Sequence, residues 1–386
     1  MTALRALALL CVALVVHGSL YPWRFASPPS FGGALAAMLA DRHWWTGRGD
    51  VIGNIVLFVP LAAIGQLALR ESRWTPGLGA VVVLSGGTVL AFALQVLQIA
   101  VPARNAALSD VLWNAVGLAL GLAIAASIEP LRRVGARWHP AGRGPARTES
   151  LALALALLWL ALQWWPFVPT LDWQHVKEAL KPLAPSTARW SWPGFVDTAL
   201  ALAVLGPLLR ANPARGPGLV ALCGLAALGK LLIVYQALTP QFVGGCLMGL
   251  ACCAAGWRAG DRPVRWLTVA AALAWYTFDE LRPFRWTELG RPFQWLPFVA
   301  SLQGSMLSNL LSLCWNLYWL GAVLLLATGL TRHAGAATCA LVAWVLMLEG
   351  LQTHLPGRTP DVTPALLPVF WWLAHRAASR HAPLMR

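Results

Sequence analysis

The chain of 386 residues is 58% hydrophobic and only 11% charged. A soluble globular domain has roughly a quarter of its residues charged, so this composition excludes a soluble domain and indicates a membrane protein. The formal net charge of +14 does not predict nucleic-acid binding, because the arginines are spread over connectors between apolar stretches. The expected partners are membrane lipids, and no nucleic acid.

Apolar stretches near the length of a membrane span recur along the whole chain. A helix needs about 20 mostly apolar residues to cross the hydrocarbon core, and continuous runs of this kind are expected to be helical because lipid cannot satisfy exposed backbone groups. The stretches are 3–20, 51–69, 77–100, 108–128, 150–168, 194–211, 216–238, 240–257, 264–278, 300–328, 334–354 and 360–378. The sequence therefore predicts an all-α membrane protein with roughly twelve transmembrane helices.

The arginines alternate between connectors. The basic connectors and the tail hold Arg70 and Arg73; Arg132, Arg133, Arg137, Arg143 and Arg147; Arg210 and Arg215; Arg258, Arg262 and Arg265; and Arg376 and Arg380. The intervening connectors are less basic and mix charges of both signs. Because cytoplasmic loops carry an excess of Lys and Arg, this alternation predicts that both termini are cytoplasmic.

Internal repeats divide the chain into three predicted four-helix copies, at 1–135, 150–258 and 264–380. Each copy opens with an apolar helix that ends in a Pro-aromatic step, and each third helix ends with Gln followed four residues later by Pro. The steps are Tyr21-Pro22-Trp23, Trp165-Pro166-Phe167 and Arg282-Pro283-Phe284, and the pairs are Gln98/Pro102, Gln236/Pro240 and Gln352/Pro356. The repeat predicts that 3–20 is a retained span rather than a signal peptide, and that matching motifs face the outer side.

Copy one concentrates polar residues at the predicted outer ends of its helices. Such residues are costly in a membrane helix and are functional candidates by default. The candidates are Asp50 and Asn54 on the second helix, Gln95 and Gln98 on the third, Arg104 in the following turn, and Asp110 and Asn114 on the fourth. The pairs four residues apart share a helix face. We expect this set to lie together, with Arg104 within ion-pair distance of Asp50 or Asp110.

The fourth helix also carries a GxxxG sequence, Gly117 and Gly121, which is typical of closely packed membrane helices. The segments GDVIGNIVLFVPL and LQVLQIAVPARNAALSDVLWNAVGLALG resemble the two signature stretches of the VanZ-like membrane proteins. The motif positions matched in this chain are Asp50, Asn54, Phe58, Pro60, Gln98, Arg104, Asp110, Asn114, Gly117 and Gly121. Gln95 departs from the pattern, because the family usually has Glu there.

Copy three keeps part of the motif, in Glu349, Gln352, Arg358 and Asp361. Asp361 follows the arginine by three residues instead of six, and Pro368 replaces the family Asn. Copy two keeps only Asp197, Pro207 and Gln236. The resemblance implies a multi-pass protein of the bacterial cytoplasmic (inner) membrane. The founding member of the family is associated with low-level resistance to a lipoglycopeptide antibiotic, and no reaction is established for the family.

The leading hypothesis is a non-enzymatic protein that binds an anionic lipid, a lipid-linked glycan or a lipoglycopeptide-type head group at its outer face. Arg104 and Arg358 would hold a phosphate, since guanidinium donors match that anion. Structural roles stay open for the same residues: ion pairs among Asp50, Arg104 and Asp110, and interhelical hydrogen bonds from the amides.

Two other functions are weighed against binding. An enzyme acting on the head group would use Asp50, Asp110 or Glu349 as general base, but the sequence has no GxSxG, HExxH, Walker or phosphatase-like motif. A transporter is disfavoured because the usual twelve-span carriers have two six-helix halves. No cofactor or metal is expected, since His17, His354 and His375 lack companions and the seven cysteines lie in apolar stretches without ligand-like spacing.

Overall fold

The computed structural model describes residues 2–45, 47–137, 149–184, 189–210, 212, 215–299, 306–331 and 333–380. Within these ranges the chain is helical, without a strand longer than an isolated bridge, which confirms the all-α prediction. Its contacts divide it into two compact units. The first contains residues 1–135 and 301–309, and the second contains 136–300 and 310–386.

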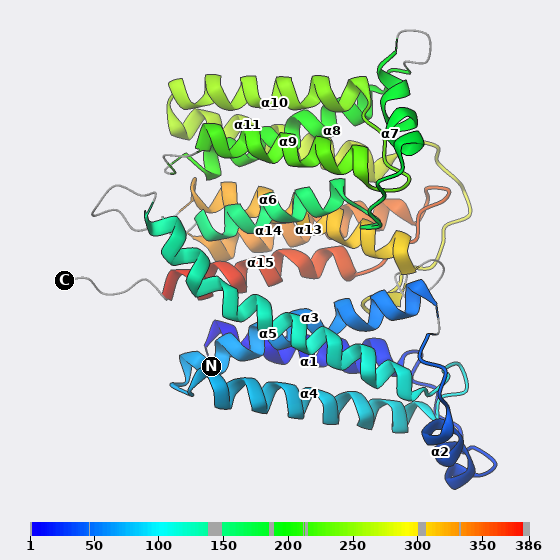
Figure 1. Ribbon diagram of the computed structural model, residues 1–386. Helices are drawn as coiled ribbons and strands as arrows, with labels where there is room; N and C mark the ends of the chain where they lie inside the picture. Colours follow the sequence, from blue (N-terminus) through cyan, green and yellow to red (C-terminus); the bar gives the residue numbers. More distant parts are fainter. Residues whose placement is uncertain are drawn as a thin grey trace. The chain divides into compact units, whose positions relative to one another are not determined.

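The first compact unit is built from five helices (Figure 1): α1 (Ala3–Leu20), α2 (Phe31–Ala40), α3 (Arg48–Glu71), α4 (Pro76–Gln98) and α5 (Leu108–Arg137). Local sequence explains the starts of several of them. The hydroxyl of Thr75 caps α4 by accepting from the amide of Leu78, and Pro76 occupies the first turn, where its missing N–H costs nothing. α1 packs on α3 and α4, around a core that includes Val15, Phe58 and Leu118.

Gly117 and Gly121 bring α5 into direct contact with the backbone of α3. A Cβ atom added to Gly117 would collide with the carbonyl oxygen of Ile55, and one added to Gly121 would collide with that of Val59. Only glycine allows this approach, because it has no Cβ. The GxxxG sequence therefore packs two helices closely, as predicted.

The second compact unit contains the remaining helices: α6 (Glu149–Gln163), α7 (Trp173–Leu180), the 3-10 helix η1 (Lys181–Leu183), α8 (Trp192–Leu208), α9 (Arg215–Leu232), α10 (Pro240–Arg258), α11 (Asp261–Leu281), α13 (Met306–Thr328), α14 (Ala334–Gln352) and α15 (Thr363–Arg380). Of α13, residues 310–328 belong to this unit. Its core includes much of α13 and α8. Trp319 and Leu324 are at most 1% exposed, and the hydroxyl of Tyr318 donates to the carbonyl of Ala201 in α8. A helix that is apolar on every face belongs in a core.

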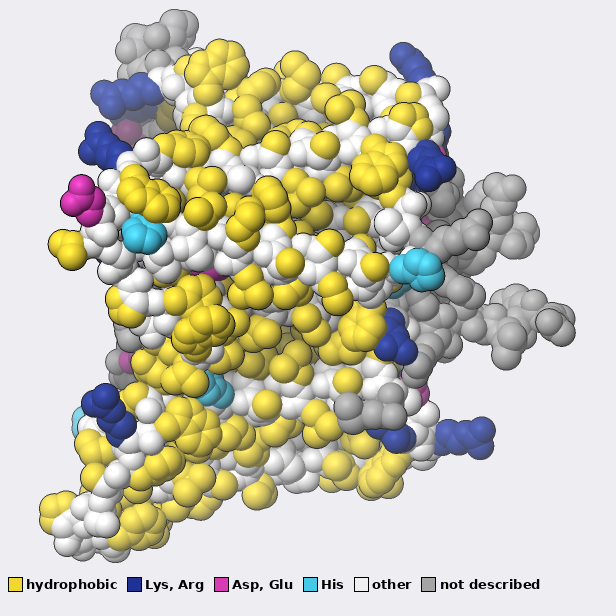
Figure 2. All heavy atoms as spheres, turned by 180° about the vertical axis from the view of Figure 1, so that it is seen from behind, with side chains coloured by type: hydrophobic (Ala, Val, Ile, Leu, Met, Phe, Trp, Pro, Cys, Tyr) yellow, Lys and Arg dark blue, Asp and Glu magenta, His cyan; other side chains and the backbone are white. Residues whose placement is uncertain are grey.

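Eight described helices are long and apolar enough to cross a membrane: α1, α3, α4, α5, α9, α10, α13 and α14. α6 and α8 are apolar but shorter, with 15 and 17 residues, and α11 and α15 do not meet the same criteria of length and hydropathy. Large apolar side chains cover the visible outer faces of the helices, whereas Lys and Arg lie near helix ends (Figure 2). The helices indicate a multi-pass membrane protein, and twelve spans stay a prediction.

The Pro-aromatic steps that follow α1, α6 and α11 have the same backbone conformation. Each X–Pro peptide is cis, and the next aromatic residue has a positive φ, of 63° at Trp23, 61° at Phe167 and 57° at Phe284. A positive φ is uncommon for a bulky residue. The amides of these residues donate to the carbonyls of Leu20, Trp164 and Leu281 at 2.8, 2.7 and 2.9 Å.

The recurring turn supports the predicted triplication, which stays a prediction. The contact boundary after residue 135 coincides with the predicted end of copy one. The region predicted as copy two lies in the second compact unit, as does the region predicted as copy three apart from residues 301–309.

Candidate functional site

The carboxyl group of Asp110 lies at the start of α5 and is held by α4. The amide nitrogen of Gln95 donates to Asp110 Oδ2 at 3.2 Å, while the amide oxygen of Gln95 accepts from the backbone N–H of Ala107 at 3.0 Å. Gln95 is buried, with 3% of its surface exposed. One amide side chain therefore fixes both the turn before α5 and the first carboxylate of that helix.

Three further predicted residues lie within interaction range of this carboxyl group: Asp50 and Asn54 from α3, and Arg104 from the turn after α4. Asp50 is exposed, whereas Asn54 and Arg104 are half-buried. We call Asp50, Asn54, Gln95, Arg104 and Asp110 the copy-one cluster. The structure thus brings together five residues that the sequence placed on three helices and the turn between two of them.

Arg104 binds the end of α1 instead of a carboxylate. Its Nε donates to the carbonyl oxygen of Tyr21 at 3.0 Å, and its Nη2 donates to that of Gly18 at 2.8 Å. Among the ion pairs of the described residues, none joins Arg104 to Asp50 or Asp110. The expected ion pair is therefore wrong, because the last carbonyls of a helix have no intrahelical partner and a cation at that end is favourable.

Burial also affects this guanidinium. It lowers the pKa of Arg104 from its ordinary value, while the negative charge of Asp110 opposes that shift. The guanidinium stays charged, as it does throughout proteins.

The other two predicted residues of copy one lie at the same helix ends. Gln98 is buried and donates from its Nε2 to the carbonyl of Ser19 at 2.8 Å, which joins α4 to α1. Asn114 lies one turn beyond Asp110 and is 4% exposed. Its Oδ1 and the hydroxyl of Ser109 are buried without a hydrogen-bond partner among the described residues.

Copy three repeats these contacts with different side chains. Gln352 donates from Nε2 to Glu280 Oε2 at 2.6 Å. Arg358 donates from Nε to the carbonyl of Arg282 at 3.1 Å and from Nη2 to that of Asp279, and its Nη1 lies 3.5 Å from Glu280 Oε2. As with Arg104, the two carbonyls are those of the residue before the proline and of the residue three positions earlier.

The hydrogen bond of Glu349 shows which residue of copy one corresponds to Asp361. Glu349 Oε2 accepts from the backbone N–H of Asp361, twelve positions later, at 3.1 Å. In copy one, Gln95 accepts from the N–H of Ala107, also twelve positions later. Asp361 therefore occupies the place of Ala107 and is no counterpart of Asp110. Its carboxylate accepts from the amide of Thr363 at 2.7 Å and so begins α15.

The comparisons with known proteins agree with this geometry. The family model VanZ/LLP1 matches residues 6–129, about a third of the chain. This segment is VanZ-like. The match contains most of α1 and α5, all of α2, α3 and α4, and the whole copy-one cluster, and it confirms the resemblance predicted from the sequence. Comparisons with curated proteins and with solved structures gave no match.

Outside the VanZ-like segment, copy two keeps a reduced version of the same helix-end contacts. Gln236 donates to the carbonyl of Trp165, the residue before the proline. Lys230, for which a snorkelling side chain is the simplest reading of the sequence, donates to Gln236 Oε1 at 3.1 Å and lies 4.9 Å from the ring centre of Phe242. In copy two, Lys230 thus holds the side-chain amide of Gln236. Among the described residues of this copy, no arginine makes the contact that Arg104 and Arg358 make in the other two.

Sequence reasoning missed Glu280 and the tryptophan partners of Asp197 in the second compact unit. Glu280, at the end of α11, is 6% exposed and binds both Gln352 and Arg358. Asp197 on α8 accepts at Oδ1 from the indole N–H groups of Trp275 at 2.9 Å and Trp315 at 3.3 Å. Tryptophans near the ends of spans are typical of an interfacial belt. Nothing in the sequence distinguished Trp275 and Trp315 from the other tryptophans.

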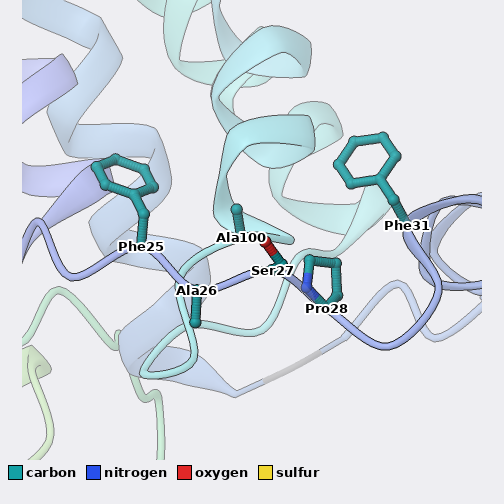
Figure 3. A pocket seen from close by; sticks show the side chains of 6 residues that line it. All are labelled: Phe25, Ala26, Ser27, Pro28, Phe31 and Ala100. Atoms are coloured by element: carbon teal, nitrogen blue, oxygen red, sulfur yellow. The ribbon is translucent and has the colours of Figure 1, made fainter.

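The VanZ-like segment also contains a shallow apolar hollow next to the α4–α5 turn (Figure 3). It has a volume of about 420 Å³ and is lined by Phe25, Ala26, Ser27, Pro28, Phe31 and Ala100. The backbone N–H of Ala26 donates to the carbonyl of Ala100 at 2.8 Å. This bond ties the connector before α2 to the same turn that carries Arg104.

Proposed function

We propose that this VanZ-like membrane protein binds an amphiphile with a sugar-bearing head group at the copy-one cluster. The proposal rests on the hydrogen-bond partners of the Arg104 guanidinium. Two of them serve the carbonyls of Gly18 and Tyr21, while Asp50 and Asp110 form no ion pair among the described residues.

The charge of the cluster decides between head groups. It contains two carboxylates and one guanidinium, so its net charge is negative. This charge repels a phosphate and does not repel a neutral ligand. Ionised carboxylates only accept hydrogen bonds, and the hydroxyl groups of a sugar are donors. Among an anionic lipid, a lipid-linked glycan and a lipoglycopeptide, the two glycan-bearing ligands therefore fit the cluster better. Asp50, the exposed carboxylate, would make the first contact.

The apolar part of the ligand has a place beside the cluster. The hollow between Phe25, Phe31 and Ala100 adjoins the turn that holds Arg104, and apolar side chains of the VanZ-like segment such as Val89 and Leu97 are exposed on α4. The charge pattern of the connectors supports an orientation with this end of the helices on the outer side of the bacterial cytoplasmic membrane and both termini inside.

The proposal is tested with the full chain in phosphatidylcholine nanodiscs prepared without sugar detergents. The probes are a neutral glycosyl diacylglycerol and the diacylglycerol with identical acyl chains but no sugar, and retention is measured by native mass spectrometry. We expect the glycolipid to be retained preferentially, and Asp50→Asn to weaken this preference about five-fold or more, as for one hydrogen bond to a charged group. Asp41→Asn, an exposed carboxylate bonded to His43 in the same unit, is the matched control.

Equal retention of the two probes would overturn the proposal. So would a preference that Asp50→Asn leaves unchanged, or one that Asp41→Asn reduces as much.

A further inference from the structure

A second polar group lies at the other ends of the helices that form the copy-one cluster. The cluster involves the end of α1 and the start of α3, so the start of α1 and the end of α3 are a full helix length away (Figure 1). Arg5 lies in the first turn of α1. Arg70 and Arg73 lie at the end of α3, with Ser72 between them.

Contacts between the helices bring these arginines together. Arg5 Nη2 donates to the hydroxyl of Ser72 at 2.9 Å, across 67 positions of sequence. Arg70 reaches α5 through an Nη1 bond to the carbonyl of Ala125 at 3.3 Å. Arg73 is exposed and has a left-handed backbone, with φ of 66°, which turns the chain from α3 towards α4. The three arginines thus lie at the same end of the unit, and Arg5 is hydrogen-bonded to the serine that stands between Arg70 and Arg73 in the chain.

Several donors of this arginine group have no protein acceptor. Arg70 Nε is buried without a hydrogen-bond partner among the described residues, and no hydrogen bond from the side chain of Arg73 occurs there. A buried donor without a partner costs free energy, so a ligand that supplies an acceptor would be favoured. Glu71 contributes one opposing charge, and its Oε2 is also without a partner in the described residues.

Apolar side chains continue from the arginine group along α4. Trp74 is 40% exposed, and Leu78 and Val81 on the first turns of α4 are 54% and 62% exposed. Tryptophan is enriched at the level of lipid head groups, and aliphatic side chains face the acyl region. The order of charge, indole and aliphatic surface follows that of phosphate, glycerol and acyl chain in a phospholipid.

We propose that Arg5, Arg70 and Arg73 bind the phosphodiester of an anionic phospholipid at this end of the first compact unit. Guanidinium groups match phosphate oxygens through forked pairs of donors. Basic pockets between membrane helices on the cytoplasmic side suit anionic head groups, and the connector charges place this end there. The site is separate from the copy-one cluster and does not depend on the proposed glycan binding.

The test uses the full chain in phosphatidylcholine nanodiscs that contain a minor fraction of phosphatidylglycerol. Native mass spectrometry measures phosphatidylglycerol enrichment around the protein. Arg5→Gln/Arg73→Gln removes two guanidinium groups and leaves the Arg70–Ala125 contact intact, and Arg70→Gln is the second variant. Arg24→Gln/Arg42→Gln, two exposed arginines at the opposite end of the same unit, is the matched control with an equal change in charge.

We expect wild type and control to enrich phosphatidylglycerol, and the loss to be about five-fold for each arginine replaced at the site. Absence of enrichment in the wild type would overturn the proposal, as would equal losses in the control, or full enrichment in both site variants. A soluble arm adds glycerol phosphate. Displacement of the lipid at millimolar concentration would identify a soluble phosphate ester as the ligand and would also overturn the lipid assignment.

Discussion

The Nε atom of Arg104 donates to the carbonyl oxygen of Tyr21 at 3.0 Å, and this contact closes the end of α1 against the α4–α5 turn. Arg358 makes the same contact with Arg282 at 3.1 Å. In both places the arginine follows the proline of the Gln–Pro pair by two residues, and its acceptor precedes the proline of the Pro-aromatic step. The motif arginine therefore has a structural role in the fold, independent of any ligand.

The first prediction concerns the stability of this helix-end contact. Arg104→Ala leaves two carbonyls without their charged donor, so we expect the free energy of unfolding to fall by about 2–4 kcal/mol. Arg104→Lys should recover only part of this loss, because an ammonium group cannot reproduce the forked geometry. Thermal unfolding of the purified protein and its abundance in membranes provide the measurements. Arg24→Ala, an exposed arginine of the same unit, should leave both unchanged.

If Arg104→Ala instead kept wild-type abundance and melting temperature, the contacts with Gly18 and Tyr21 would contribute nothing to the fold. The arginine would then act on a ligand alone.

The second prediction tests the close approach of α3 and α5. Gly117→Ala would place a methyl group against the carbonyl of Ile55, and crowding of this kind costs about 1–3 kcal/mol. Gly86→Ala on α4 is the control, because nothing lies within 4 Å of its added Cβ. We expect a lower melting temperature for the first variant and no loss for the second. Equal melting temperatures would show that α3 and α5 separate without cost.

The sequence predicted the helices well because lipid leaves few alternatives to them. Apolar runs of sufficient length must satisfy their backbone internally, and each predicted stretch overlaps a described helix. The short helices α2 and α7 lie in connectors, where local capping determines whether a helix begins. Ser30 accepts from the amide of Gly33, and Asp172 accepts from that of Gln174. Such caps occur in many loops, so they could not be read as helix starts from one sequence.

The proximity of the polar residues in copy one was predictable from the sequence, but their hydrogen-bond partners were not. Helical spacing placed Asp50 with Asn54 and Asp110 with Asn114, and the motif order placed Arg104 in the turn between α4 and α5. The partner of Arg104 was not predictable, because the carbonyls of Gly18 and Tyr21 are backbone groups that carry no residue signature. Asp361 was matched to Asp110 by residue type, and only the hydrogen bond to Glu349 assigned it to the place of Ala107.

The third prediction concerns the carboxylate that joins α8 to α11 and α13. Asp197→Leu leaves the indole N–H groups of Trp275 and Trp315 without an acceptor, at about 1–3 kcal/mol for each buried group. Asp197→Asn keeps a carbonyl acceptor of the same shape, so its melting temperature should lie close to that of the wild type. Trp315→Phe in the Asp197→Leu background should add little further loss. Fully additive losses would show that the aspartate and the indole do not interact.

The fourth prediction follows from the equivalence of Glu349 and Gln95. Both side chains accept from a backbone N–H twelve positions later, and a neutral amide oxygen suffices for this in copy one. Glu349→Gln should therefore change the free energy of unfolding by less than about 1 kcal/mol, the usual net value of one hydrogen bond.

Glu349→Leu removes the oxygen that accepts from the buried N–H of Asp361, so its melting temperature should fall clearly below that of Glu349→Gln. Thermal unfolding in one detergent compares the two variants with wild type. The reciprocal change, Gln95→Glu, places a second carboxylate at hydrogen-bond distance from Asp110 and should destabilise the protein. A Glu349→Gln variant as unstable as Glu349→Leu would mean that the charge of Glu349, rather than its acceptor oxygen, is what copy three requires.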